Sequence, residues 1–445
     1  MDNKITQLAN SIKSIPDYQK YGLVTKVSGI LIECKGLQNE VSVGSRCEII
    51  NRNDDPILAE VVGLNEETAL MMPFYHIESI GVGCRVLLEK SQSVIYPDQS
   101  WKGRIVNALG DAVDEKGILA KGDQAYFLKS SPPPAHKRQP VRGKFDVGVR
   151  AINTFTTCCR GQRLGIFAGS GVGKSMLISM LTKYSEADVK IIGLIGERGR
   201  ELYEFIHEYL GEEGMRSAVI VAATSDESAL MRRQAAYTTM AIAEYFRDQG
   251  QNVLCLMDSV TRFAMAQREI GLSAGEPPAT KGYTPTVFVE LPKLLERAGP
   301  GIDKGYITGL FTVLVEGDDH NEPISDAVRG ILDGHIVLDR EIAERGRYPA
   351  INILRSVSRT LPACNDEQQN QMVTKARKYL SLYNDMAELI RLGAYRSGSD
   401  PNVDDAIFYN DSLEEFLSQR VDEKNNFNEC YAKLGQILAQ TRTQS

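Results

Sequence analysis

The sequence has no long hydrophobic run and no CxxC pair of cysteines. None of its stretches approaches the ~18 consecutive apolar residues of a membrane-spanning helix. Its first residues, MDNKITQLANSIKSIPD, lack the apolar segment of a signal peptide. Eight cysteines are scattered without a CxxC motif, so we expect reduced thiols in a cytoplasmic protein. We interpret the adjacent Cys158 and Cys159 as packing residues.

Positive charge is also in short supply. The 445 residues include 51 Lys and Arg against 58 Asp and Glu, a net charge of −7. This balance disfavours a protein that coats nucleic acid or anionic lipid, although basic loops inside a ring could still serve a nucleic-acid motor. The length and the 42% hydrophobic content indicate a globular protein of about three domains.

Hydrophobic spacing divides the chain into four parts. Residues 1–20 carry apolar side chains at helical spacing, which predicts an amphipathic helix that either packs on its own domain or docks on a partner or a membrane surface. Residues 21–90 hold short strand-like runs cut by glycines, typical of a small β-barrel. Residues 91–362 alternate apolar strands with amphipathic helices, which predicts a parallel α/β domain. Residues 363–445 have helical periodicity and predict a helical C-terminal domain.

A loop of small residues between an apolar strand at 163–167 and an apolar helix at 176–181 carries the clearest chemical signal. The pattern is that of a P-loop, because small residues let backbone N–H groups close around phosphates at a helix N-terminus. In such a loop Lys174 reaches the β and γ oxygens and Ser175 ligates Mg²⁺. The residues that we assign to the nucleotide phosphates are Gly169, Ser170, Gly171, Val172, Gly173, Lys174, Ser175 and Met176.

Two further apolar runs end in carboxylates. The run 253–258 ends in Asp258, an arrangement that holds Mg²⁺ next to a P-loop. The run 191–196 leads into Glu197, which could polarise the attacking water as a general base. A helix-capping or ion-pairing role for Glu197 stays open from these residues alone.

Phosphoryl transfer also needs positive charge beyond the γ-phosphate. Arg262 follows Asp258 by four residues, and Arg355 and Arg359 lie in a loop-like stretch between two prolines. Each of these arginines could equally be a surface charge.

Four motifs together resemble the rotary ATPase superfamily of F1-ATPase subunits: GERGRE at 196–201, MDSVTRF at 257–263, YPAIN at 348–352 and SVSR at 356–359. The segments AQREIGLSAGEPPATKGYTP, which ends at 285, and ELPKLLERAG, which ends at 299, resemble the flagellum-specific type III export ATPases. The resemblance implies an α/β fold with a RecA-like P-loop NTPase core, an N-terminal β-barrel and a C-terminal helical domain.

The same resemblance implies ATP and Mg²⁺ as cofactors. It implies one role for each matching residue: Glu197 as the catalytic carboxylate, Asp258 and Ser175 in the Mg²⁺ shell, Lys174, Arg198 and Arg262 on the phosphates, Tyr348 stacked on adenine, and Arg359 as an arginine finger inserted into the neighbouring subunit's site. One departure lies near the adenine, where Arg420-Val421 follows Gln419 in place of Pro-Phe, so base selectivity is expected to be looser.

One chain carries both the glutamate and the finger, so the resemblance implies a homohexamer with a complete site at every interface. It also implies a flagellar export motor at the inner membrane. Its expected partners are a stator-like regulator at residues 1–20, a central coiled-coil stalk protein, export-gate membrane proteins, and export chaperones with their substrates, without nucleic acid. Three alternatives stay open: the catalytic subunit of a rotary proton-translocating ATP synthase, the ATPase of a virulence type III secretion system, and a nucleic-acid motor.

Overall fold

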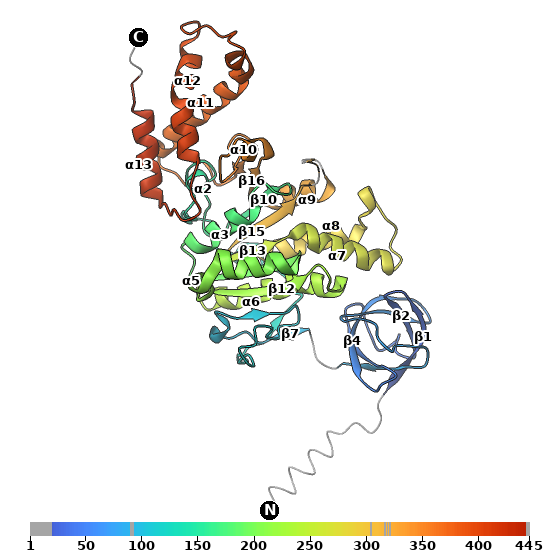
Figure 1. Cartoon of the computed structure of the whole chain (residues 1–445). Helices are drawn as coiled ribbons and strands as arrows, with labels where there is room; N and C mark the ends of the chain where they lie inside the picture. Colours follow the sequence, from blue (N-terminus) through green and yellow to red (C-terminus); the bar gives the residue numbers. More distant parts are fainter. Residues whose placement is uncertain are drawn as a thin grey trace, which may run out of the picture. The chain divides into compact units, whose positions relative to one another are not determined.

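The computed structural model describes residues 20–89, 93–302, 305–315, 317, 319 and 322–441. The amphipathic helix predicted within residues 1–20 falls outside this part of the chain. The chain divides into two compact units, of which the first consists mainly of the residues before 94 and the second of most of the rest (Figure 1). In the described ranges no helix is both long enough and apolar enough to cross a bilayer.

The first unit is a closed antiparallel barrel with the strand order β1-β2-β5-β4-β3-β6. Every second side chain along β2 and β3 is buried, including Ile32, Cys34, Cys47 and Ile49, because successive residues of a strand point to opposite faces. The predicted N-terminal barrel is therefore confirmed. Its strands are β1 (Tyr21–Ser28), β2 (Leu31–Lys35), β3 (Arg46–Ile50), β4 (Pro56–Leu64), β5 (Ala69–Pro73) and β6 (Arg85–Leu88).

The second unit is built on a mainly parallel sheet with the order β17-β16-β10-β15-β13-β11-β12-β8, in which β14 pairs with β15. Its central strands are buried on both faces, which is why they read as continuous apolar runs. The strands are β8 (Ile105–Val106), β10 (Arg163–Ala168), β11 (Val189–Glu197), β12 (Ala218–Thr224), β13 (Asn252–Asp258), β14 (Gly299–Pro300), β15 (Tyr306–Leu314), β16 (Gly334–Leu338) and β17 (Val357–Ser358). A separate ribbon pairs β7 (Val94–Ile95) with β9 (Tyr126–Phe127).

Helices cover this sheet, as the α/β pattern predicts (Figure 1). Among the described residues before 360, the helices are α2 (Arg150–Phe155), α3 (Lys174–Tyr184), α4 (Gly199–Glu204), the π-helix η3 (Phe205–Leu210), α5 (Gly211–Met215), α6 (Ala229–Asp248), α7 (Val260–Ser273), α8 (Pro285–Leu295), α9 (Pro323–Ile331) and α10 (Arg340–Glu344). Short 3-10 turns lie at Gln99–Trp101, Ala135–Lys137 and Thr280–Gly282.

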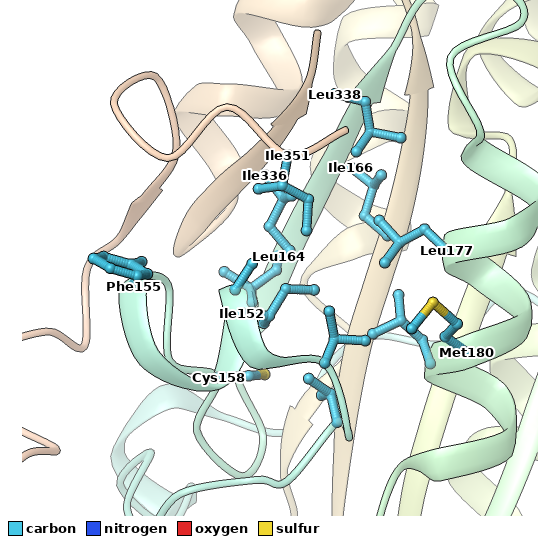
Figure 2. Packing of buried hydrophobic residues seen from close by; sticks show 14 of the residues in the cluster. Ile152, Phe155, Cys158, Leu164, Ile166, Leu177, Met180, Ile336, Leu338 and Ile351 are labelled. Carbon is cyan, nitrogen blue, oxygen red and sulfur yellow. The ribbon is translucent and has the colours of Figure 1, made fainter. Parts of the chain in front are cut away.

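The core around β10 fixes the position of the P-loop. Figure 2 shows Ile166 of β10 packed with Leu177 of α3 and Ile336 of β16. Burial of each such side chain contributes roughly 1.5–3 kcal/mol to stability. The strand before the loop and the helix after it are therefore both anchored.

The C-terminal region consists of α11 (Glu367–Arg391), α12 (Pro401–Leu417) and α13 (Phe427–Leu438). Ala376, Tyr379 and Leu380 of α11 are buried, and the Tyr379 ring stacks on Tyr409 with centroids 4.8 Å apart. These helices confirm the predicted helical C-terminal region. The boundaries after residues 20, 90 and 362 stay predictions.

Candidate active site

The P-loop joins the end of β10 to the start of α3. Gly171 and Gly173 have φ angles of +77° and +88°, which glycine adopts at little cost. A Cβ atom on Gly173 would lie 3.2 Å from two ring atoms of Tyr348, so a side chain there would crowd the ring in addition to straining the backbone. Val172 points into the core instead and is 1% exposed. The loop conformation thus depends on the residue types that the sequence pattern singled out.

The P-loop forms one wall of a cleft of about 630 Å³. The opposite walls come from the ends of β11 and β15, from α7 and from α10, which are distant in sequence. Among the predicted site residues, the cleft is lined by Gly169, Ser170, Gly171, Gly173, Lys174, Ser175, Met176, Glu197, Arg198 and Arg262. The structure therefore brings most of the predicted phosphate residues together.

Lys174 lies between the two predicted carboxylates. Its Nζ donates to Oδ1 of Asp258 at 2.5 Å and lies 3.4 Å from Oε1 of Glu197. The Thr312 hydroxyl also donates to Oδ1 of Asp258, at 2.6 Å. Burial alone would lower the pKa of Lys174, but Asp258 and Glu197 outweigh it and raise that pKa. Lys174 therefore stays charged at neutral pH.

The pKa of Glu197 is also shifted, in the direction that favours the neutral carboxyl. Burial disfavours its charged form and raises its pKa to about 7, while Lys174 opposes the shift and Asp258 and Glu201 add to it. A carboxyl with a pKa near the working pH is suited to accept and release a proton. This favours the general-base interpretation of Glu197 over a capping role.

Arg262 lies near the start of α7 and contributes a partly buried cation to the cleft. Its Nε atom is buried and has no hydrogen-bond partner within the described ranges. Arg198 lines the same cleft at the start of α4, where its side chain is 82% exposed and lies 3.7 Å from Glu201. An incompletely paired guanidinium beside a P-loop is suited to bind an anion.

Tyr348 lies behind the loop rather than in the described cleft. Its ring faces Gly173, and its backbone carbonyl accepts a hydrogen bond from the backbone N–H of Gln419 at 2.8 Å. Phe416, three residues before Gln419, is 4% exposed and contacts the Phe155 ring edge-on at 6.4 Å. The segment predicted to lie near adenine therefore packs partly on α2.

Arg359 does not join this site within one chain. Its backbone N–H donates to the Asp333 carbonyl at 2.9 Å, and Asp333 pairs through its carboxylate with Arg163, the first residue of β10. The P-loop begins after Ala168, the last residue of β10, and a strand rises roughly 3.3 Å per residue, so the two ends are about 16 Å apart. Arg359 is exposed, and its side chain has no hydrogen bond or ion pair within the described residues. Arg355 is likewise outside the cleft, with its guanidinium 3.8 Å from Asp339.

Several further residues, which were not predicted from the sequence, also lie at the site. Glu201, Thr261 and Arg340 line the cleft, and Arg340 donates to the Ser170 carbonyl at 3.5 Å. Thr312 supports Asp258 from the neighbouring strand. Arg340 follows β16 as Asp258 ends β13, so the strand-end rule used for the carboxylates could have found it.

Comparisons with known proteins show the family of the chain. Residues 148–358 match the model of the ATP synthase alpha/beta family, nucleotide-binding domain. Residues 24–88 match the beta-barrel domain of that family, and residues 365–436 match the T3SS EscN ATPase C-terminal domain. A flagellum-specific ATP synthase of Caulobacter vibrioides is 57% identical over 97% of this chain and 98% of its own length. The chain belongs to the flagellum-specific ATP synthase family.

Solved structures related to this family match over most of the chain. The assembled ATPase EscN of the enteropathogenic E. coli type III secretion system covers 94% of this chain and 100% of its own, with a TM-score of 0.89 and 39% identity. EscN in complex with its central stalk EscO gives a TM-score of 0.86 at 38% identity. The family resemblance inferred from the motifs is therefore confirmed, and the P-loop, β11 and β13 all lie inside the matched nucleotide-binding segment.

Proposed function

We propose that this chain is the ATP-hydrolysing motor of a flagellar type III protein export apparatus and that it works as a homohexamer. The observation that carries the proposal is the placement of the two halves of a hydrolytic site. Lys174, Glu197 and Asp258 meet at one end of β10, whereas Arg359 is exposed at the other end. A ring of identical chains lets the arginine of one subunit complete the site of the next.

Within one site each residue has a separate role. The P-loop amides and Lys174 hold the β- and γ-phosphates, and Arg262 and Arg198 add positive charge along the cleft. Glu197 in its ionised form accepts the proton of the attacking water. Arg359 from the neighbour stabilises the charge that develops on the transferred phosphoryl group, a contribution of roughly 10³ to 10⁵ in rate. Tyr348 stacks on the base.

The residues also fit Mg²⁺. Ser175 and Asp258 offer a hydroxyl and a carboxylate oxygen, and both line a cavity of about 20 Å³ next to Lys174. No group of three or more His, Cys, Asp or Glu side chains suited to a metal exists within the described residues. Magnesium is usually held by one or two protein oxygens together with substrate phosphates and water, so a two-ligand site is sufficient. When bound, Mg²⁺ neutralises charge on the phosphate oxygens.

The flagellar assignment rests on the higher identity to a flagellar relative, 57%, than to the assembled virulence ATPase EscN, 39%. This chain carries both Glu197 and Arg359. In a proton-translocating synthase of the F1 type the catalytic glutamate and the arginine finger belong to two different kinds of subunit, which argues against that function here. The expected partners follow from the family: a central coiled-coil stalk, as EscN has in EscO, a stator-like regulator at residues 1–20, export-gate membrane proteins, and chaperones with their export substrates. The motor would then work in the cytoplasm, at the inner membrane.

The experiment is a gene deletion with complementation in the organism of origin. Flagellar proteins in the culture medium should disappear on deletion and return with the wild-type gene but not with Lys174→Ala. Undiminished export after deletion would contradict the proposal. In parallel, hydrolysis per subunit of the purified chain should rise with the fraction of hexamer, measured by mass photometry across protein concentrations.

A further inference from the structure

A second cavity, of about 420 Å³, lies between the α/β domain and the C-terminal helices. α10 and the segment 352–355 line one side of it, and α11 and α12 line the other. We propose that this cavity is a binding site for a small amphipathic molecule with an apolar body and one oxyanion group. Among the described residues, it shares no lining residue with the phosphate cleft. The inference does not depend on the proposed function.

The cavity has an apolar floor. Ile353, Leu380 and Leu417 line it, and all three are buried in the hydrophobic core of this unit. The partly buried side chains of Tyr383 and Ala387 extend this surface along α11. Cavities of roughly 300 to 1,000 Å³ that combine an apolar lining with a few polar groups are the usual sites for small ligands. The floor therefore suits an aromatic or aliphatic body.

Arg347 brings a buried positive charge to the cavity. It directly precedes Tyr348, lines the cavity and is 9% exposed. Its guanidinium donates to the carbonyls of Pro349 at 3.5 Å and Ile351 at 3.0 Å. A guanidinium has five N–H donors, and within the described residues only these two hydrogen bonds use them, so its buried Nε lacks an acceptor in hydrogen-bond geometry. Unused donors at the wall of a cavity suit the oxyanion of a ligand.

Glu414 of α12 compensates this charge only in part. Its Oε2 lies 2.8 Å from Nε of Arg347, an ion pair without the geometry of a hydrogen bond. Burial lowers the pKa of Arg347 in spite of Glu414, which indicates an incompletely compensated cation. The Glu414 side chain is 44% exposed, so it can turn into solvent and leave the guanidinium to a ligand. Glu414 is therefore a competitor of the oxyanion.

The other acids at the cavity have partners of their own. The Asp339 carboxylate accepts the Glu341 backbone N–H at 3.0 Å and the Asn352 side-chain amide at 2.9 Å. The Glu341 carboxylate lies 3.7 Å from the guanidinium of Arg345 on the surface of α10. These contacts leave Arg347 as the group that receives the oxyanion. A carboxylate, sulfonate or phosphate on a ring system or a short hydrocarbon chain has the matching chemistry.

The test titrates the full-length protein with anilinonaphthalene sulfonate, a fluorescent probe with an aromatic body and one sulfonate. We expect saturable binding of one probe per chain. Phenylnaphthylamine, the same body without the sulfonate, should bind at least about fivefold more weakly, because it lacks one charge-assisted hydrogen bond. Saturating ADP with Mg²⁺ should leave the sulfonate probe bound. Displacement by ADP, or equal affinity for the two probes, would overturn the proposal.

Glu414→Gln removes the competing carboxylate and keeps the size of the side chain. We expect the sulfonate probe to bind about three- to tenfold more tightly to this variant, and the neutral probe to bind as before. Glu415→Gln is the matched control, because Glu415 is adjacent, exposed and outside the cavity lining. An unchanged affinity in Glu414→Gln, or an equal gain in Glu415→Gln, would contradict the assignment of Arg347 as the oxyanion partner.

Ala387→Phe fills the cavity with a ring. Both probes should lose roughly tenfold or more in affinity, whereas Leu389→Phe, on exposed surface of the same helix, should bind them as the wild type does. Saturating sulfonate probe should raise the melting temperature of the wild type by about 2 °C and leave that of Ala387→Phe unchanged. A folded Ala387→Phe chain, checked by circular dichroism, that binds one probe with wild-type affinity would refute the site.

Discussion

The backbone N–H of Arg359 donates to the Asp333 carbonyl at 2.9 Å. Asp333 in turn pairs with Arg163 at the start of β10, while Lys174 begins the helix after the end of that strand. The two predicted catalytic cations therefore sit at opposite ends of one strand, and a single subunit cannot bring them together.

Mixing two inactive variants should restore activity if the site is shared. Arg359→Ala keeps an intact P-loop, and Lys174→Ala keeps an intact finger, so a mixed ring regains complete sites at about one quarter of its interfaces. We expect each variant alone to lose at least ~10²-fold in its rate of hydrolysis. The mixture should recover a measurable part of that rate, which an assay of phosphate release would detect. No recovery in rings shown to contain both variants would refute the trans arrangement.

Arg355→Ala is the matched control for Arg359. Arg355 lies four residues earlier and is also exposed, but its guanidinium lies near Asp339 of its own chain. We expect less than a threefold change in hydrolysis. A loss as large as that of Arg359→Ala would shift the finger role to this residue or divide it between the two.

Lys174→Ala should abolish turnover by removing the ammonium from the phosphate cleft. We expect a loss of roughly 10²–10³ in kcat, typical of removing a preorganised charge that stabilises the transition state. Lys183→Ala is the control, because Lys183 is exposed near the other end of the same helix. The circular dichroism spectrum of both variants should match that of the wild type, and a folded Lys174→Ala chain with normal turnover would contradict the role of Lys174.

Glu197→Gln should separate binding from hydrolysis. The amide keeps the shape of the side chain but cannot accept the proton of water, so we expect nucleotide affinity within a few-fold of wild type and a loss of at least ~10² in kcat. Glu201→Gln tests the specificity of the effect, because Glu201 lines the same cleft with a half-exposed side chain. Comparable losses in both variants would show that charge in the cleft, rather than the base, limits the rate.

The rate should depend on pH through the same carboxyl. Burial raises the pKa of Glu197 to about 7, so its basic form is lost as the pH falls below that value. We therefore expect kcat/KM to decline tenfold per pH unit well below pH 7, in stopped assays with saturating Mg²⁺. An acidic limb centred near pH 4.5 would mean that Glu197 is not the titrating base.

The stability of the fold should depend on pH in the opposite direction from the rate of hydrolysis. A carboxyl whose folded pKa is raised from 4.5 stabilises the fold below pH 4.5, and this contribution disappears as the pH rises through about 7. Glu197→Gln lacks this titration, so its melting temperature should improve relative to wild type between pH 4.5 and 7.5. A constant difference across that range would argue against the buried carboxyl as its source.

Gln419→Ala should destabilise the junction between the α/β domain and the C-terminal helices. The Gln419 side chain accepts from the Arg150 N–H at 2.7 Å and donates to the carbonyls of Gly148 and Glu423 at 2.8 and 2.7 Å. Leaving these buried groups unpaired costs about 3 kcal/mol in unfolding free energy. Urea unfolding measures the loss, and Gln371→Ala on exposed α11 surface should change it by less than about 0.5 kcal/mol.

The sequence predicted those parts of the fold whose signals are local. Strands β10, β11 and β13 are buried on both faces, so each reads as an unbroken apolar run, and Asp258 and Glu197 were found because each stands where such a run ends. The small β-barrel followed from several short apolar runs cut by glycines, and the structure gives it six strands.

Contacts between distant segments left no such signal. Nothing next to Thr312 indicates that β15 lies beside β13 and carries this side chain to Asp258. The order of strands in the sheet decides which residues become neighbours, and one sequence does not reveal that order.

The separation of Lys174 and Arg359 along β10 also constrains how copies of this chain can associate. A two-fold pairing brings the same patch of both copies together, so it completes a site only if Lys174 and Arg359 belong to one patch, and the length of β10 separates them. Only a head-to-tail contact joins unlike edges, and any open chain of such contacts leaves one unused site and one unused arginine at its tips. A closed ring is then the assembly in which every subunit has a complete site.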